Sequence, residues 1–160
     1  MTKPKRSKAG STQDSNGAIL VLHGPNLNML GRRPSVHYGT LTLRDLEDRV
    51  RGWGEERGMS VGCFQTNHEG AFVDAVQGLR GQADGALINA AAFTHTSLAI
   101  RDAVLAVQLP FVEVHLSNIF AREPERRHSR LADLAVGIVA GFGPHGYLLG
   151  LQALVTRLRG

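Results

Sequence analysis

Residues 18–26, AILVLHGPN, form a short apolar run that ends at a cluster of polar residues. The same arrangement recurs twice: GALI at 85–88 leads into Asn89 and THTS at 94–97, and PFV at 110–112 leads into EVHLSN at 113–118. Short apolar runs without alternation are typical of strands buried on both faces of a parallel sheet. Because ligands bind beyond the carboxyl ends of such strands, the three polar clusters predict one shared site.

Apolar runs alternate with amphipathic segments along the rest of the chain. The predicted strands cover residues 18–22, 59–65, 85–89, 110–115 and 135–140, and the predicted helices cover residues 42–57, 71–79, 97–107 and 146–158. Thr42 and Asp45 have the spacing of a capping box. Alternation of this kind requires right-handed crossovers and a parallel sheet with both faces covered. We therefore predict an α/β, flavodoxin-like three-layer sandwich with a five-stranded parallel sheet in the order 2-1-3-4-5.

The positive charge of the chain is concentrated near its beginning. Of the net charge of +4, residues 1–17 contribute +3, which leaves +1 for the remaining residues. A nucleic-acid-binding surface needs a basic stripe on the folded part, so this distribution argues against a nucleic-acid partner. We expect a disordered basic tail at 1–17 and a single domain at 18–160.

The remaining composition limits the chemistry further. No apolar run approaches about 18 residues and no signal-like stretch follows the basic residues, so we expect a cytoplasmic protein without a membrane partner. The single cysteine, Cys63, excludes an internal disulfide and a two-thiol zinc site, and its apolar setting predicts a small buried hydrophobe. All three lysines lie in the tail, which leaves the domain without a lysine for a Schiff base.

The loop at 23–39 is long for a compact domain, and its apolar residues favour a lid over a disordered segment. Within it, Arg33 lies five residues before Tyr38. A guanidinium about 5 Å from a phenol would lower the pKa of the phenol by roughly two units, which would make tyrosinate available as a general base. The alternative is that Tyr38 only packs its ring while Arg33 stays solvated.

Two other strand ends carry residues suited to binding and proton transfer. Asn89 opens a segment of small residues that leads to a helix start, where Thr94 or Ser97 could be the N-cap. His95 and Asp102 could contact substrate hydroxyls or each other, since seven residues span two helical turns. A polar loop follows the fourth strand, and its arginines could clamp a carboxylate or lie on a solvated or subunit-contact surface: Arg122, Arg126, Arg127 and Arg130.

Glu113 and His115 alternate along the fourth predicted strand, so their side chains share one face. A carboxylate beside an imidazole raises the basicity of the ring and fixes its tautomer, which suits a proton donor. A satisfied structural histidine is the alternative. Potential zinc or iron ligands are present, namely His68, Glu69, His95, Glu113 and His115, but without His-x-x-x-His or Cys-x-x-Cys spacing. We expect no metal and no cofactor, with a metal-dependent hydrolase as one alternative.

A series of short blocks occurs in a characteristic order. They are GPNLN at 24–28, Arg33 with YG at 38–39, QTNHEG at 65–70, THTS at 94–97, RD at 101–102, EVHLSN at 113–118, ARE at 121–123, and GFG with GY between 141 and 147. In these blocks, from about Ile19 to Leu154, the chain resembles the type II 3-dehydroquinases, or 3-dehydroquinate dehydratases. The number of blocks at matching spacing makes the resemblance specific.

The resemblance implies loss of water from 3-dehydroquinate to give 3-dehydroshikimate, through an enolate and without metal or cofactor. It implies a catalytic domain that serves the shikimate pathway, for aromatic amino acid biosynthesis, or quinate catabolism. By the same resemblance Tyr38 is the base at C2, Arg33 on the lid lowers its pKa, and Asn26 holds a water for the enolate oxygen. His115 resembles the acid that protonates the departing C1 hydroxyl, and Glu113 the residue that orients it.

Substrate binding and assembly are implied in the same way. The implied substrate-binding residues are Asn89, His95, Leu116, Ser117 and Arg126, with Asp102 reaching into a neighbouring subunit's site. The family forms homododecamers, which are tetramers of trimers. The lysine-free domain agrees with the resemblance, because the unrelated type I enzymes use a lysine imine.

The chain departs from the family pattern at four places. His23 replaces an asparagine, Pro34-Ser35 replaces Glu-Pro, Ala90-Ala91 replaces Pro-Gly or Ala-Gly, and Phe120 replaces a histidine. None of these positions is an implied catalytic group. A second alternative is a binding module of the same fold that holds a polyhydroxy carboxylate without turnover.

Overall fold

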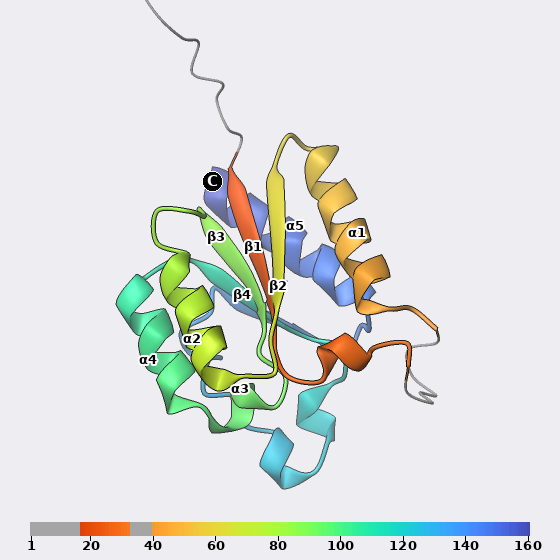
Figure 1. Ribbon diagram of the computed structural model, residues 1–160, viewed down its shortest axis with the longest axis vertical. Coiled ribbons are helices and arrows are strands. Elements are labelled where there is room, and N and C mark those ends of the chain that lie inside the picture. Colours follow the sequence, from red (N-terminus) through yellow and green to blue (C-terminus); the bar gives the residue numbers. More distant parts are fainter. Residues whose placement is uncertain (1–16, 33–39) are drawn as a thin grey trace, which may run out of the picture.

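The computed structural model describes residues 17–32 and 40–160, and its centre is a five-stranded sheet (Figure 1). The strands are β1 (Ala18–His23), β2 (Ser60–Gln65), β3 (Gly85–Asn89), β4 (Phe111–His115) and β5 (Gly137–Ala140). All neighbouring strands are parallel, and their order is β2-β1-β3-β4-β5. The predicted flavodoxin-like α/β architecture and strand order are therefore confirmed.

Helices cover both faces of the sheet. The long helices are α1 (Leu43–Glu55), α2 (Glu69–Gly78), α4 (Leu98–Val107) and α5 (His145–Arg159), and the short ones are α3 (Phe93–Thr96), η1 (Leu27–Met29), η2 (Ile119–Ala121) and η3 (Pro124–Arg126). Helices α1 and α5 pack on one face with Ile19, Val21 and Leu87, whereas α2 and α4 pack on the other (Figure 1). Within the described ranges, no helix has the length and apolar character needed to cross a membrane.

Local sequence signals account for two helix starts. Thr42 and Asp45 form the predicted capping box of α1, in which each side chain accepts a hydrogen bond from the other residue's backbone amide. Ser97 caps α4 by accepting a hydrogen bond from the Ile100 amide at 2.9 Å. Helix α1 then buries Leu46 and Val50 against the sheet, at the spacing expected of one helical face.

The structure corrects several predicted boundaries and burial patterns. Helix α2 begins at Glu69 instead of residue 71, which places an acidic side chain in the first turn, where the helix dipole favours it. Strand β5 begins at Gly137 instead of residue 135. The edge strands β2 and β5 are also not buried on both faces, since Phe64 is 38% exposed and Ile138 is 36% exposed.

The register of the sheet brings the strand ends to one edge. His23 at the end of β1 lies beside Gln65 of β2 and Asn89 of β3, and His115 ends β4 beside Ala140. Only glycine fits at residue 24, because a Cβ atom there would lie 2.2 Å from the backbone oxygen of Ala90. The close approach of these two loops lets the polar residues that follow β1 and β3 share one site.

Candidate active site

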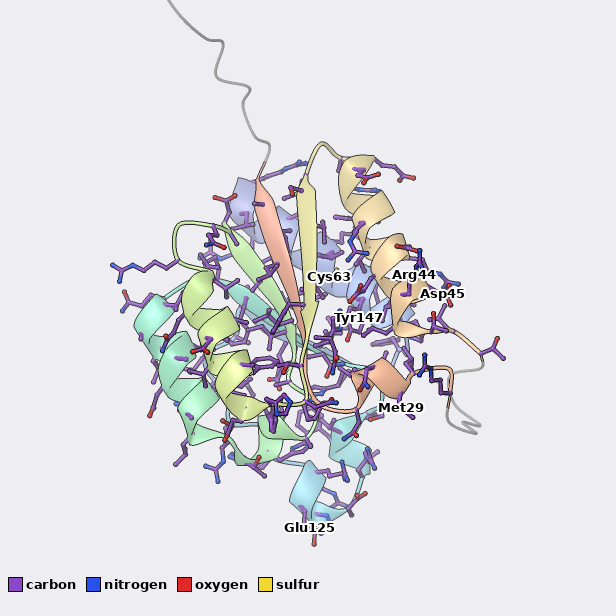
Figure 2. All side chains as sticks on the ribbon, in the orientation of Figure 1. Met29, Arg44, Asp45, Cys63, Glu125 and Tyr147 are labelled. Atoms are coloured by element: carbon purple, nitrogen blue, oxygen red, sulfur yellow. The ribbon has the colours of Figure 1, made fainter. Side chains whose placement is uncertain are left out.

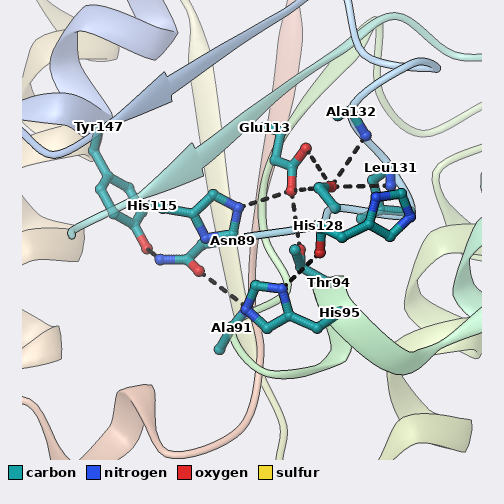
Figure 3. A network of polar contacts seen from close by, with 11 residues as sticks. Asn89, Ala91, Thr94, His95, Glu113, His115, His128, Leu131, Ala132 and Tyr147 are labelled. Atoms are coloured by element: carbon teal, nitrogen blue, oxygen red, sulfur yellow. Dashed lines mark hydrogen bonds and ion pairs between the residues drawn. The ribbon is translucent and has the colours of Figure 1, made fainter. Parts of the chain in front are cut away.

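The centre of the polar edge is a buried pair on β4. His115 Nε2 lies 2.7 Å from Glu113 Oε1, and the Glu113 side chain is fully buried (Figure 3). Both side chains point to the α2 and α4 side of the sheet, as their alternation along the strand predicted. With a carboxylate as partner, Nε2 must be the donor, which leaves Nδ1 as the second functional atom of the ring.

Two hydroxyl groups complete the surroundings of Glu113. Thr94 Oγ1 donates to Oε1 at 3.0 Å, and Ser129 Oγ lies 2.7 Å from Oε1 and 2.9 Å from Oε2 (Figure 3). Burial alone would raise the pKa of Glu113, but the hydrogen bond and charge of His115 and the two hydroxyl donors outweigh it and hold this pKa below its ordinary value. Glu113 is therefore a carboxylate near neutral pH, and it anchors His115.

Ser129 and Thr94 were not predicted in this role. Ser129 lies in the loop after η3 and also accepts hydrogen bonds from the amides of Leu131 and Ala132, which fixes its hydroxyl. Of the two N-cap candidates, Ser97 is the cap, and Thr94 turns its hydroxyl to Glu113 instead. The sequence indicated Thr94 only as a possible N-cap, which does not identify Glu113 as the partner of its hydroxyl.

A second set of contacts holds Asn89. Its Nδ2 donates to Tyr147 Oη at 2.8 Å, and its Oδ1 accepts from the Ala91 amide at 3.1 Å (Figure 3). Tyr147 is fully buried, and this burial raises the pKa of its phenol, so it remains protonated and acts only as a hydrogen-bonding group. Ala91 adopts a φ of 49°, in the left-handed region that favours glycine.

His95 reaches the same edge from α3. Its Nδ1 lies 2.8 Å from the backbone oxygen of His128, so Nδ1 carries the hydrogen and Nε2 is left as an acceptor. His95 and Asp102 were expected two turns apart on one helix, but they lie on different helices. The chain is extended at Ser97, which separates α3 from α4. Asp102 instead lies exposed on α4.

The first loop approaches from the other side of β3. Asn26 has a left-handed φ of 67°, a conformation that asparagine tolerates well, and its amide donates to Asn67 Oδ1 at 2.9 Å. Gln65 Nε2 donates to the same Asn67 oxygen at 3.0 Å and to the Gly24 backbone oxygen at 3.3 Å. Gln65 and Asn67 thus hold the loop that carries Asn26, a role their sequence block did not specify.

The remaining predicted site residues are partly buried near the site, paired elsewhere, or outside the described residues. Leu116 is buried and its backbone oxygen accepts from the Gly143 amide at 2.9 Å, while Ser117 is half-buried. Arg126 in η3 pairs with Glu123 at 2.6 Å. Arg33 and Tyr38 lie outside the described residues, as does part of the predicted lid. The structure therefore brings Asn89, His95, Glu113 and His115 together (Figure 3).

The expectation of no cofactor did not take account of residues 141–146, GFGPHG, which have the Gly-x-Gly-x-x-Gly spacing of dinucleotide-binding loops. The amides of Gly141 and Gly143 donate to the backbone oxygens of His115 and Leu116, at 3.3 and 2.9 Å. Pro144, at the start of α5, has no amide hydrogen to offer an anion. These glycines serve the close approach of the β5–α5 turn to β4, so their spacing does not favour a phosphate-binding loop.

The potential metal ligands considered from the sequence do not gather at one point. Glu113 and His115 are occupied with each other, and His95 bonds a backbone oxygen. Among the described residues, a group of three potential ligands is found elsewhere: His23, Glu47 and Cys63. Cys63 is half-buried and not a fully buried hydrophobe as predicted, and burial raises the pKa of its thiol to about 12.

The fold and the site together define a flavodoxin-like α/β protein with a carboxylate-held histidine at the carboxyl edge of its sheet. The chain belongs to the class II dehydroquinase family, whose model matches residues 17–155. It is 54% identical over 141 residues to a 3-dehydroquinate dehydratase of Ruegeria pomeroyi, covering 88% of this chain and 95% of that relative. It is 50% identical over 142 residues to catabolic 3-dehydroquinase 1 of Neosartorya fischeri, covering 89% and 95%.

Solved structures agree with this assignment. The type II dehydroquinase of Propionibacterium acnes matches with a TM-score of 0.82 and 42% identity, over 87% of this chain and 96% of that one. A type II dehydroquinase of Butyrivibrio crossotus also gives 0.82, at 38% identity over 86% and 96%. The family resemblance stated from the sequence blocks is confirmed.

Proposed function

We propose that this chain removes water from 3-dehydroquinate to give 3-dehydroshikimate through an enolate intermediate. The observation that carries the proposal is His115, held by the buried Glu113 carboxylate at the edge of the sheet. Relatives at similar identity are named both as 3-dehydroquinate dehydratases and as catabolic 3-dehydroquinases. The proposal therefore concerns the reaction, which either pathway can use.

The elimination needs a base and an acid. A C–H bond beside a ketone is weakly acidic, so Tyr38 as tyrosinate, with its pKa lowered by Arg33, removes the C2 proton. The charge that develops on the ketone oxygen is stabilised by a water held by Asn26. Hydroxide is a poor leaving group, so imidazolium His115 gives a proton to the C1 hydroxyl, which departs as water.

Glu113 suits this assignment of His115. Its carboxylate accepts from Nε2 and stabilises the imidazolium, so Nδ1–H is the atom that faces the leaving hydroxyl. Asn89, His95, Ser117 with the Leu116 backbone, and Arg126 are proposed to bind the hydroxyl and carboxylate groups of the substrate. Because Tyr147 and Ala91 fix both ends of the Asn89 amide, this residue is preorganised for binding.

The proposal includes a homododecamer, a tetramer of trimers, in which Asp102 contributes to a neighbouring subunit's site. The exposed position of Asp102 on α4 is compatible with such a contact. Around the edge strand β5, three large apolar side chains are exposed: Phe120 by 53%, Phe142 by 63% and Ile138 by 36%. An apolar surface beside an unpaired strand edge favours burial against another copy. Native mass measurement should give about 200 kDa, twelve times the 17.3 kDa of one chain.

A direct assay tests the reaction. Purified protein is mixed with 3-dehydroquinate, and the enone absorbance of the product is followed with and without excess chelator. We expect turnover in both conditions, with loss of turnover in Tyr38→Phe and in His115→Ala. His128→Ala is the matched control, because its side chain is exposed and only its backbone oxygen contacts the site.

The same assay separates the alternatives. Binding of substrate without turnover would favour the binding module of the same fold. Activity that chelator abolishes would favour the metal-dependent hydrolase. Near wild-type turnover in His115→Ala would remove His115 from the mechanism.

A further inference from the structure

On the α1 and α5 side of the sheet, three side chains with metal-binding atoms lie close together. They are His23 at the end of β1, Glu47 on α1 and Cys63 on β2, and their ligand atoms all lie within 4.8 Å of one another. Cys63 on β2 and Tyr147 on α5 occupy the layer between the sheet and these helices (Figure 2). The proposed catalytic residues Glu113 and His115 lie on the opposite face, so this group is not used in the elimination.

The imidazole of His23 is the unusual member of the group. The residue is completely buried, and its Nε2 has no hydrogen-bond partner. The Oε1 atom of Glu47 lies 3.5 Å from Nε2. A buried polar atom without a partner is uncommon and costly in native proteins. Here that atom faces a carboxylate and a thiol, which are two further metal-ligand types.

We propose that His23 Nε2, Glu47 Oε1 and Cys63 Sγ form a binding site for Zn²⁺. Nitrogen, oxygen and sulfur donors are the set that Zn²⁺ accepts, at about 2.0–2.3 Å from the metal. Tetrahedral ligands at these lengths lie roughly 3.3–3.8 Å apart. The 3.5 Å between His23 and Glu47 already matches this range. The two pairs that include Cys63 Sγ lie within 4.8 Å, so they must approach by at most about 1 Å.

The neighbouring groups fit this arrangement. Arg51 Nη2 donates to Glu47 Oε2 at 3.1 Å, which leaves Oε1 for the metal and orients the carboxylate. On the other side of the ring, His23 Nδ1 lies 3.2 Å from Tyr147 Oη. Binding at Nε2 places the ring hydrogen on Nδ1, so the Tyr147 hydroxyl, which already accepts from Asn89 Nδ2, must then accept from Nδ1 as well instead of donating to it. Three protein ligands leave the fourth position of the metal for water.

The experiment uses the untagged, full-length protein, freed of metal and kept reduced, and titrates it with Co²⁺ as a spectroscopic substitute for Zn²⁺. Because Cys63 is the single cysteine of the chain, any thiolate-to-cobalt charge-transfer band belongs to this residue. We expect one equivalent of Co²⁺ to produce the band, Zn²⁺ to displace it, and the thermal midpoint to rise with metal concentration.

Variants test each ligand. Cys63→Ser should abolish the band, and His23→Asn should weaken Co²⁺ binding roughly 100-fold or more, since loss of an outer partner alone costs about 10- to 100-fold. If His23→Asn or Cys63→Ser fails to fold, Glu47→Gln on helix α1 provides a third test and should also weaken Co²⁺ binding. His68→Asn is the matched control, because this histidine is exposed and precedes α2, which packs on the opposite face of the sheet, and it should leave binding unchanged. The absence of a thiolate band, or equal affinity in wild type and in His23→Asn or Glu47→Gln, would overturn the proposal.

Discussion

Replacing Glu113 by glutamine tests whether the charge of this buried carboxylate is what makes His115 an effective acid. Glu113 accepts a 2.7 Å hydrogen bond from His115 Nε2 and further hydrogen bonds from Thr94 and Ser129. Glutamine keeps the volume but removes the negative charge. Its amide hydrogens also face donors, so at least one hydrogen bond is lost.

The size of the effect follows from that hydrogen bond. A hydrogen bond to a charged group contributes about 1.5–3 kcal/mol. Each 1.4 kcal/mol or so of barrier corresponds to a tenfold change in rate. If the stabilisation acts mainly on the imidazolium that donates its proton, kcat should fall about 10- to 160-fold while KM changes little.

Steady-state turnover of 3-dehydroquinate measures this loss, with circular dichroism as a check of folding. Thr94→Val is the matched control: it removes the neutral donor at 3.0 Å but keeps the carboxylate. A neutral hydrogen bond contributes about 0.5–1.5 kcal/mol, so the control should lose only about 2- to 10-fold. Equal losses in the two variants, or unchanged kcat in Glu113→Gln, would refute the role assigned to the charge.

Three further predictions concern stability and assembly. Burial and the nearby Arg51 lower the pKa of His23 in the folded protein to about 4, from the ordinary value of 6.5. Between these two pH values only the unfolded state binds this proton, so the free energy of unfolding falls as the pH drops. Urea unfolding, measured in chelator at fixed protein concentration, should show that the free energy of unfolding falls by up to about 3 kcal/mol over this range. The variant His23→Asn should lose this pH dependence, and the same pH dependence in wild type and variant would contradict the burial argument. Ala91→Gly should raise the thermal midpoint by about 2–8 °C, because the left-handed conformation costs alanine about 1–2 kcal/mol; an unchanged or lower midpoint would show that the strain is absent. Phe142→Asp should produce particles lighter than the dodecamer by native mass measurement, and an unchanged mass would exclude this surface from the interface.

The architecture was predictable because it depends on local patterns. Short apolar runs such as 18–22 and 85–89 alternate with amphipathic segments, and right-handed crossovers then leave few possible sheets. The capping box at Thr42 and the shared face of Glu113 and His115 also follow from spacing alone. The capping box and the Glu113–His115 pair each join residues at most three positions apart.

The site was only partly predictable, because its supporting contacts join distant residues. Ser129 meets Glu113 across 16 positions, and Asn89 meets Tyr147 across 58. No periodicity relates such pairs, so neither contact could be predicted from one sequence. The break between α3 and α4 has a different reason: Ser97 is the N-cap of α4, so His95 precedes that helix and cannot share its face with Asp102.

The division of labour between Tyr38 and His115 is tested most directly by hydrogen exchange at C2 of 3-dehydroquinate. The substrate is incubated in D₂O with each variant, and NMR follows deuterium uptake at C2 together with the appearance of 3-dehydroshikimate. We predict that His115→Ala still introduces deuterium above the enzyme-free rate although it forms little product, because the enolate forms but the hydroxyl cannot leave. Tyr38→Phe should show neither exchange nor product. Exchange that persists in Tyr38→Phe, or product formation at the wild-type rate in either variant, would contradict the mechanism.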